Sequence, residues 1–280
     1  MSIVIGESAD YRKSTYMKIK EEIKYYFIKK EKCTLLEEDF IGNIQIVGSS
    51  GSGKSMFSFD ILENEIGFYN QLALLDEYDA RVFISNLKKD LKSKIKVIYF
   101  KNKKSIIETI NELKKDKNKL IMLVFNNNIN FLEFEKEIKE LIDKIEKNKK
   151  ESLLKIYLLR YTCSKSMINL IKKNIMKSKC MNISYIILSY NLLDLDLFKT
   201  KIIFKTYDPE FVYKLRVFIN QRDIINLNMG EFILIKNYNK VNLLNKRYWI
   251  NKMYYKERNQ KKEDLDSLEV FDLKQKIDDF

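Results

Sequence analysis

One stretch of the sequence, Gly48-Ser-Ser-Gly-Ser-Gly-Lys-Ser55, combines residue types and a spacing that could carry out chemistry. It follows the apolar segment Ile44-Gln-Ile-Val47 and precedes apolar residues at helical spacing. In this strand-to-helix setting, glycines let the backbone turn tightly and direct its N–H groups at phosphate oxygens, and the helix adds the positive end of its dipole. The pattern therefore predicts a phosphate-binding loop. The residues expected to surround the phosphates are Gly48, Ser49, Ser50, Gly51, Ser52, Gly53, Lys54 and Ser55.

The pair Lys54-Ser55 makes this prediction specific. A lysine at this position reaches the β- and γ-phosphates of a nucleotide, and the serine hydroxyl ligates Mg²⁺. An ordinary Gly/Ser turn between a strand and a helix would explain the glycines, but it would not explain the adjoining lysine and serine. We therefore expect the chain to bind ATP with Mg²⁺, and we expect Lys54 to stabilise the charge of a transferring phosphoryl group.

The elements that position this loop can be predicted from hydrophobic periodicity. A chain of 280 residues with 45% hydrophobic residues can bury a sizeable core. Strands are predicted at 41–47, 81–85, 95–100, 120–125, 183–189 and 201–206, with a hairpin formed by 228–235 and 240–244. Helices are predicted at 55–66, 105–115, 131–159, 164–177 and 209–220, and 11–32 reads as an amphipathic helix or extended arm.

This alternation of strands and helices predicts an α/β fold, a mostly parallel sheet flanked by helices, with the nucleotide at the carboxyl ends of the strands. We expect three regions: an N-terminal helical arm over 1–39, a nucleotide-binding domain over 40–250 and a charged C-terminal tail over 251–280.

The net charge of +13 suggests a nucleic-acid partner, because lysines that neutralise phosphates release counterions. The bias toward Lys, Ile and Asn is also what an AT-rich genome produces, so genome composition is the favoured explanation of the charge, and a basic surface for nucleic acid stays open. His is absent, and Cys33, Cys163 and Cys180 lack metal-site spacing, which excludes a structural zinc and a His-dependent triad.

No segment approaches the roughly 20 apolar residues of a membrane helix, so we expect a cytoplasmic protein without a membrane partner.

The order of these elements resembles the poxvirus-type DNA-packaging ATPases of the FtsK–HerA branch of P-loop motors, over roughly residues 40–240. Behind the phosphate loop, the segments that carry the resemblance are Arg81-Val-Phe-Ile-Ser85, Ile95-Lys-Val-Ile-Tyr-Phe100, Leu120-Ile-Met-Leu-Val-Phe125, Asn182-Ile-Ser-Tyr-Ile-Ile-Leu-Ser-Tyr190 and Leu227-Asn-Met-Gly-Glu-Phe-Ile-Leu234. The resemblance implies a RecA/FtsK-like core in a homo-oligomeric ring that translocates double-stranded DNA. If the protein is viral, it implies a place in the virus factory or the virion.

The same resemblance exposes departures from the family pattern. The family's Walker B strand ends in two carboxylates, one at the Mg²⁺ shell and one that polarises the attacking water, and Asn126 and Asn127 take these positions here. The sensor strand ends in Tyr190, or Ser189 if the register slips, where the family has Gln. Lys179 takes the place of an Arg that completes a neighbour's site. An amide cannot accept a proton from water, so the resemblance predicts weakened or lost hydrolysis.

Two other functions stay open at this point. One is a non-catalytic, nucleotide-gated scaffold or DNA-binding subunit that partners an active paralogue. The other is a small P-loop phosphotransferase that uses Asp76 or Asp79, which follow the apolar run Leu72-Ala-Leu-Leu75. For Asp76, Glu77 and Asp79, a polar loop that leads into a strand at 81–85 is the favoured interpretation.

Overall fold

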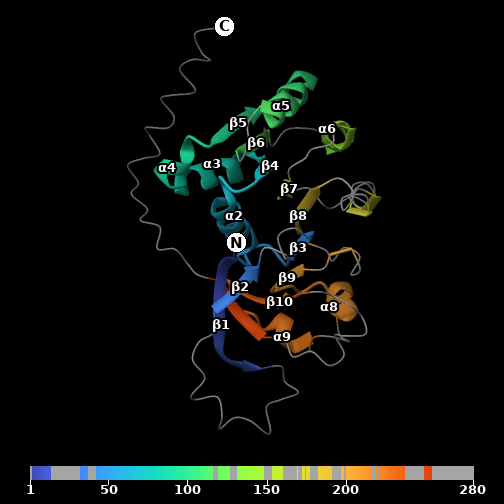
Figure 1. Ribbon diagram of the computed structural model, residues 1–280. Coiled ribbons are helices and arrows are strands. Elements are labelled where there is room, and N and C mark those ends of the chain that lie inside the picture. Colours follow the sequence, from blue (N-terminus) through green and yellow to red (C-terminus); the bar gives the residue numbers. More distant parts are fainter. Residues whose placement is uncertain are drawn as a thin grey trace.

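Eleven strands form one sheet in the order β2-β1-β11-β10-β9-β3-β8-β7-β4-β6-β5 (Figure 1). The computed structural model describes residues 2–13, 32–36, 42–115, 119–126, 131–147, 153–159, 169, 172–173, 175–176, 182–190, 197–198, 200–215, 219, 221–236 and 249–253. The strands are β1 (Ser2–Lys13), β2 (Lys32–Leu36), β3 (Ile44–Val47), β4 (Asn70–Asp76), β5 (Ile95–Tyr99), β6 (Leu120–Phe125), β7 (Leu154–Leu158), β8 (Ile183–Ser189), β9 (Thr200–Phe204), β10 (Glu231–Ile235) and β11 (Trp249–Met253). The helices are α2 (Lys54–Glu65), α3 (Glu77–Asn86), α4 (Lys89–Lys92), α5 (Lys103–Lys115), α6 (Phe131–Lys147), α8 (Pro209–Leu215) and α9 (Gln221–Ile225).

The larger part of the sheet is parallel. Strands β9, β3, β8, β7, β4, β6 and β5 pair in parallel, whereas β10, β11, β1 and β2 extend the sheet with antiparallel pairs. Every residue of β4, β6 and β8 is buried, and β6 is a continuous apolar run, as a strand covered on both faces requires. The predicted α/β architecture is therefore confirmed.

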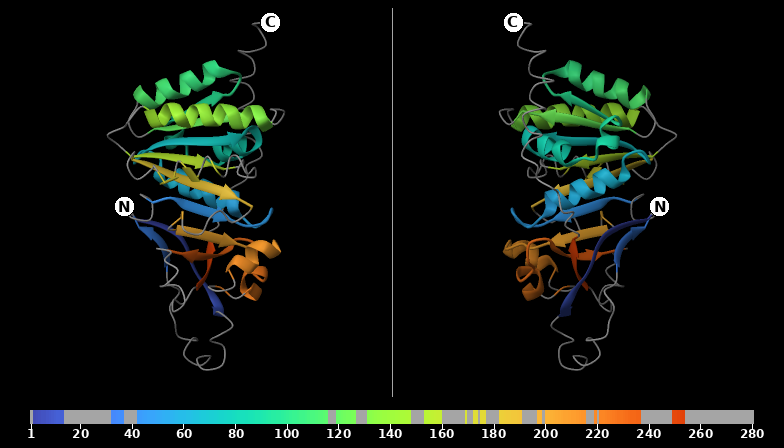
Figure 2. Two further views of the ribbon diagram at one scale, coloured as in Figure 1. Left: turned by 90° about the vertical axis from the view of Figure 1, so that its right-hand side faces the viewer. Right: turned by 90° about the vertical axis from the view of Figure 1, so that its left-hand side faces the viewer.

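Helices cover both faces of the parallel strands (Figure 2). Residues of α2 and α3 share one core cluster with one side of the sheet, and residues of α5 and α6 share a second cluster with the other side. Helices α8 and α9 pack beside the antiparallel part, in a third cluster that includes Val47, Ile203 and Ile233. This arrangement leaves the carboxyl ends of the parallel strands as one edge of the sheet, where the phosphate loop lies.

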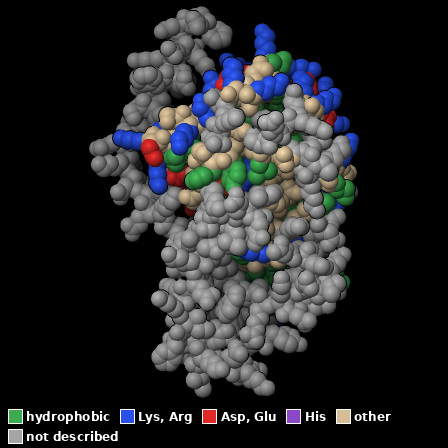
Figure 3. All heavy atoms as spheres, in the orientation of Figure 1, with side chains coloured by type: hydrophobic (Ala, Val, Ile, Leu, Met, Phe, Trp, Pro, Cys, Tyr) green, Lys and Arg blue, Asp and Glu red, His purple; other side chains and the backbone are tan. Residues whose placement is uncertain are grey.

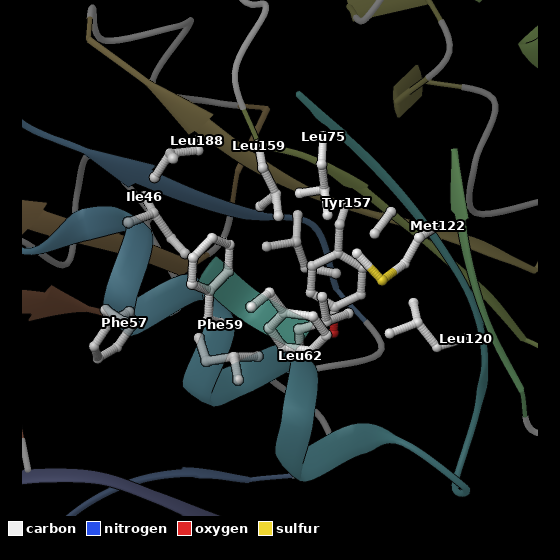
Figure 4. Packing of buried hydrophobic residues seen from close by; sticks show 14 of the residues in the cluster. Ile46, Phe57, Phe59, Leu62, Leu75, Leu120, Met122, Tyr157, Leu159 and Leu188 are labelled. Carbon is white, nitrogen blue, oxygen red and sulfur yellow. The ribbon is translucent and has the colours of Figure 1, made fainter. Parts of the chain in front are cut away.

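Helix α2, which begins directly after the loop, is buried along its length. Figure 4 shows Phe59 and Leu62 from this helix packed between Ile46 of β3 and Tyr157 of β7, whereas Phe57 points to another side, where its ring packs against Phe204 and Phe232. The three α2 side chains are 2% exposed or less. Because burying such a side chain stabilises the fold by about 1.5–3 kcal/mol, α2 has a fixed position against the sheet, and so has the loop at its first residue.

Most of the predicted elements are confirmed: the strands near 41–47, 95–100, 120–125, 183–189 and 201–206, and the helices that begin near 55, 105, 131 and 209. Within the predicted helix 164–177, the described positions 169, 172–173 and 175–176 are helical. In the predicted hairpin, 231–235 is strand β10, and 240–244 lies outside the described residues.

Two predictions between these elements are wrong. Residues 81–85 belong to helix α3 instead of a strand, because Asp76 caps that helix by accepting a 2.7 Å hydrogen bond from the backbone N–H of Asp79. The apolar residues just before Asp76 form the strand. The helix predicted over 131–159 ends at Lys147, and Leu154–Leu158 forms strand β7.

The prediction of an N-terminal helical arm over residues 1–39 is also wrong for the part of this region that the structure describes. Ser2–Lys13 and Lys32–Leu36 are strands β1 and β2, which pair with each other and, through β1, with β11. Residues 14–31 and the tail beyond Met253 lie outside the described residues.

Candidate phosphate-binding site

The loop between β3 and α2 is attached to three neighbouring segments by backbone hydrogen bonds. Gly48 N–H donates to the carbonyl of Ser189 at the end of β8 (3.4 Å), and Ser49 N–H donates to the carbonyl of Lys205 just after β9 (2.8 Å). On the third side, Gly230 N–H, from the turn before β10, donates to the Ser52 carbonyl (3.0 Å). The loop conformation is thus fixed by the sheet and by that turn.

Two of the glycines are required by this geometry. A Cβ atom on Gly48 would lie 2.8 Å from Phe204 Cβ and 3.1 Å from the Lys205 carbonyl oxygen, so the strand behind the loop leaves no room for a side chain. Gly53 precedes α2 with φ of 102°, a left-handed conformation that favours glycine. Both features support the closely wrapped loop that the sequence predicts.

The first turn of α2 is suited to an anion. This helix has no side-chain cap at Gly53 and no acidic residue in its first turn, so its N-terminal N–H groups carry the positive end of the helix dipole without a protein carboxylate nearby in sequence. The Oγ atom of Ser52, buried within the loop, has no hydrogen-bond partner among the described residues. A phosphate oxygen would satisfy both the N–H groups and this hydroxyl.

Lys54 is folded back on the loop. It is 6% exposed, and its Nζ donates to the backbone carbonyl of Ser49 at 2.6 Å. The same Nζ lies 4.7 Å from the centroid of the Tyr190 ring. Burial lowers the pKa of Lys54 from its ordinary value of 10.5 to about 8. The ammonium group therefore lies within the loop, where a phosphate oxygen would meet it.

The remaining side chains around the loop are polar. Ser49 Oγ lies 3.4 Å from Thr206 Oγ1 and accepts a hydrogen bond from Tyr207 N–H. Ser55, the expected magnesium ligand, is half-buried in the first turn of α2. Within the described residues, no group of three or more acidic, His or Cys side chains could hold a metal ion.

The structure does not bring Asn126 to this loop, which corrects the expected metal-binding position. Asn126 follows β6, and β6 is the fourth strand from β3 in the sheet order. At about 4.8 Å per strand, that separation is roughly 19 Å, far beyond the reach of an amide side chain. Asn127 and Lys179 lie outside the described residues.

Asp76 and Asp79 are also remote from the loop. The pairing register places Asp76 in the same row as Ser189 and Val47 but three strands from β3, or roughly 14 Å. Asp76 is fully buried where it caps α3, and burial raises the pKa of Asp79. These carboxylates stabilise the start of a helix in this structure.

The strand between β8 and β4 is β7, which the sequence does not predict. Its last residue, Leu158, and the following Leu159 are apolar, and the next two residues in the sequence are Arg160 and Tyr161. The alternation Leu154, Ile156, Leu158 is the available signal for a strand.

Tyr190 is predicted only as a substituted sensor position, because its contact with Lys54 cannot be read from the sequence.

Solved structures show what this fold resembles. The structure of VirB4 of Thermoanaerobacter pseudethanolicus is similar with a TM-score of 0.60 and 10% identity, over 91% of this chain and 96% of that chain. The cytoplasmic domain of the Thermomonospora curvata type VII secretion ATPase EccC is similar with a TM-score of 0.53 and 12% identity, over 91% of this chain and 28% of that chain. No protein-family model and no curated protein matches the chain. The chain therefore has the fold of a P-loop NTPase of the RecA/FtsK type.

Proposed function

We propose that this protein is an ATP-binding ATPase of the secretion and DNA-packaging type, with weakened hydrolysis. The observation that carries the proposal is the loop itself, in which the uncapped start of α2, the unpartnered Ser52 hydroxyl and the Lys54 ammonium lie together. Nothing else in the described residues needs these three groups in one place, whereas a triphosphate would use all of them.

Each group has a separate role in this proposal. The N–H groups of the loop and of the first turn of α2 bind phosphate oxygens, and Lys54 neutralises charge on the β- and γ-phosphates. Mg²⁺, when bound, supplies further charge neutralisation, and Ser55 is the side chain that would ligate it.

Weakened hydrolysis is supported by the residues at the strand ends near the loop. Hydrolysis needs a group that accepts a proton from the attacking water, and carboxylates commonly serve. On the β8 side of the loop, the described residues at the strand ends are Ser189 and Tyr190 of β8 and Leu158 and Leu159 of β7, and none of them carries a carboxylate. On the other side, β9 ends at Phe204 and is followed by Lys205, Thr206 and Tyr207, which carry none either. Asp208, the first carboxylate after β9, accepts a hydrogen bond from Glu210 N–H at the start of α8. Lys179 remains our proposed basic residue that completes a neighbouring subunit's site.

Double-stranded DNA is the proposed partner, bound by a homo-oligomeric ring or together with an active paralogue. Residues 88–104 contain eight lysines and one aspartate, a net charge of +7 out of the chain's +13. Two of these lysines lie near glutamates of α5 and α6, Lys96 near Glu108 (3.9 Å) and Lys103 near Glu140 (3.7 Å). The local excess of lysines that is left supports an electrostatic surface for phosphates. In Figure 3, basic side chains gather over the part of the surface formed by α4, β5 and α5.

The test combines ATP binding with steady-state turnover. We expect the protein to bind ATP, to lose that binding by at least about tenfold in Lys54→Ala, and to keep it in the control Lys139→Ala, an exposed lysine on α6. We expect turnover far below the typical ~10 per second of enzymes. Absence of binding in the intact protein would refute the ATPase, and rapid turnover would refute the weakened site alone.

A non-catalytic scaffold or DNA-binding subunit differs from this proposal only in having no turnover at all. Tight ATP binding with no phosphate release, even in the presence of DNA, would select it. The phosphotransferase is not favoured, because Asp76 and Asp79 lie at the start of α3, away from the loop.

A further inference from the structure

Tyr190 stands at the end of β8, directly after the residue whose carbonyl accepts the hydrogen bond from Gly48. Its neighbour Ser189 is 3% exposed, whereas Tyr190 is 47% exposed. The backbone at this point is therefore fixed to the phosphate loop, while the ring is half in solvent. A side chain in this position can turn about its own bonds without disturbing the core.

The ring of Tyr190 contacts the one positive charge that the loop contains. Lys54 Nζ lies 4.7 Å from the ring centroid, within the distance at which a cation is attracted to the face of an aromatic ring. The same ammonium also donates the 2.6 Å hydrogen bond to the Ser49 carbonyl. A triphosphate that reaches Lys54 thus meets an ammonium that already has two partners, the ring and the carbonyl.

We propose that Tyr190 is a positioning residue that covers Lys54 when no nucleotide is bound, and that triphosphate binding displaces its ring from the ammonium. This inference rests on the ATP-binding function proposed above. It follows that the protein binds ATP more slowly and less tightly than the same loop would without the ring. A cation–ring contact of ordinary strength corresponds to about a two- to tenfold effect on the dissociation constant.

The experiment measures association rate and affinity of the full chain for a fluorescent ATP analogue by stopped flow, at pH 7. We expect Tyr190→Leu, which removes the ring and keeps an apolar side chain, to bind about two- to tenfold more tightly, with faster association. Tyr190→Phe keeps the ring and should stay within about twofold of the natural protein. Tyr190→Trp, with the strongest cation-binding ring, should bind more weakly than either.

Inorganic triphosphate, used as a competitor, locates the effect. If the ring acts at the phosphates, Tyr190→Leu should strengthen binding of inorganic triphosphate by the same factor as binding of the nucleotide. An effect confined to the nucleotide would mean that the ring contacts the base, and it would overturn the inference. The matched control is Tyr78→Leu, which removes an exposed tyrosine from α3 and should change nothing.

The outcomes separate this inference from the proposed function. Unchanged or weaker binding in Tyr190→Leu, with binding abolished in Lys54→Ala, would overturn the inference and leave the ATPase proposal standing. Absence of binding in the natural protein would overturn both. If Tyr190→Leu fails to fold by circular dichroism, the comparison of Phe, Tyr and Trp at this position still gives the expected order or contradicts it.

Discussion

At the scale of single residues, the charge of Lys54 decides how the site responds to pH. Burial lowers the pKa of this lysine to about 8, so the free protein begins to lose the ammonium charge just above neutral pH. A triphosphate binds the charged form, so binding is linked to the proton on Lys54. Below pH 8 the ammonium is mostly present and binding is strong, and above pH 8 binding weakens as the proton leaves.

We therefore expect the dissociation constant for ATP to rise about eightfold between pH 7.5 and pH 9, in proportion to the protonated fraction of Lys54. Lys54→Arg gives the control, because a guanidinium stays charged over this range. Its affinity, whatever its absolute value, should not vary with pH. Calorimetric titration at several pH values measures both, and a flat profile for the natural protein would contradict the linkage.

The roles of the loop residues could be predicted from the sequence, whereas the position of Asn126 outside the loop could not. Gly48 to Ser55 could be recognised because each residue type has a local reason that depends only on its neighbours in sequence. The position of Asn126 depended on which strands lie side by side, which local sequence does not encode. Three strands, β8, β7 and β4, lie between β3 and β6, so the end of β6 is far from the loop.

At the scale of elements, helix α2 is fixed at both of its ends. Its first residue belongs to the phosphate loop, and its last residue, Glu65, forms a fully buried ion pair with Lys155 of β7 at 2.6 Å. Tyr157, also on β7, donates a hydrogen bond to the other carboxylate oxygen of Glu65. Burial, followed by the charge of Glu65, raises the pKa of Tyr157 well above its ordinary value, so this phenol remains a donor.

We predict that Lys155→Met lowers the free energy of unfolding by about 3–5 kcal/mol, because it leaves a buried carboxylate without its cation. Adding Glu65→Gln should recover much of this loss, since the neutral amide still accepts from Tyr157. Urea-induced unfolding followed by circular dichroism gives the values. Lys144→Met, which breaks a surface pair with Glu140, should cost less than about 1 kcal/mol. Equal losses of unfolding free energy in Lys155→Met and Lys144→Met would show that the buried pair contributes no more to stability than the surface pair.

The same pair explains why β7 was not predicted. Lys155 interrupts the apolar run of this strand, and charged residues precede it from α6 onward, so the segment reads as the continuation of a charged helix. The lysine is buried because Glu65, ninety residues earlier in the sequence, provides its partner. For α3, the five residues 81–85 favour a strand by composition, and the cap provided by Asp76 determines a helix instead.

At the scale of the whole molecule, the basic segment 88–104 runs along one end of the sheet, from α4 through the edge strand β5 to the first turn of α5. Strand β5 is the fifth strand from β3, roughly 24 Å from the phosphate loop, so this surface is separate from the nucleotide site. None of the described helices combines the length and apolar character that a membrane crossing needs.

We expect the protein to bind a short DNA duplex with a strong salt dependence, and the triple substitution of Lys88, Lys89 and Lys101 by Glu to weaken this binding by at least about tenfold at moderate salt. The slope of log affinity against log salt should fall by about 0.9 for each DNA phosphate that the variant no longer neutralises. The control replaces Lys136, Lys139 and Lys147 of α6 by Glu, which changes the net charge equally. Fluorescence anisotropy of a labelled duplex measures DNA affinity for both variants. Equal losses of affinity would indicate an effect of total charge and contradict a local DNA-binding surface.

The antiparallel extension has a consequence for how the chain reaches its native state. Strand β1 pairs with β11, which emerges from the ribosome more than two hundred residues after it. Until then, β2 is the strand that pairs with β1, and a two-stranded ribbon by itself is marginal in water, so the packing of α2 against β1 has to support it. The nucleotide-binding core can assemble while translation continues, but the sheet is completed only when its earliest strand meets its latest.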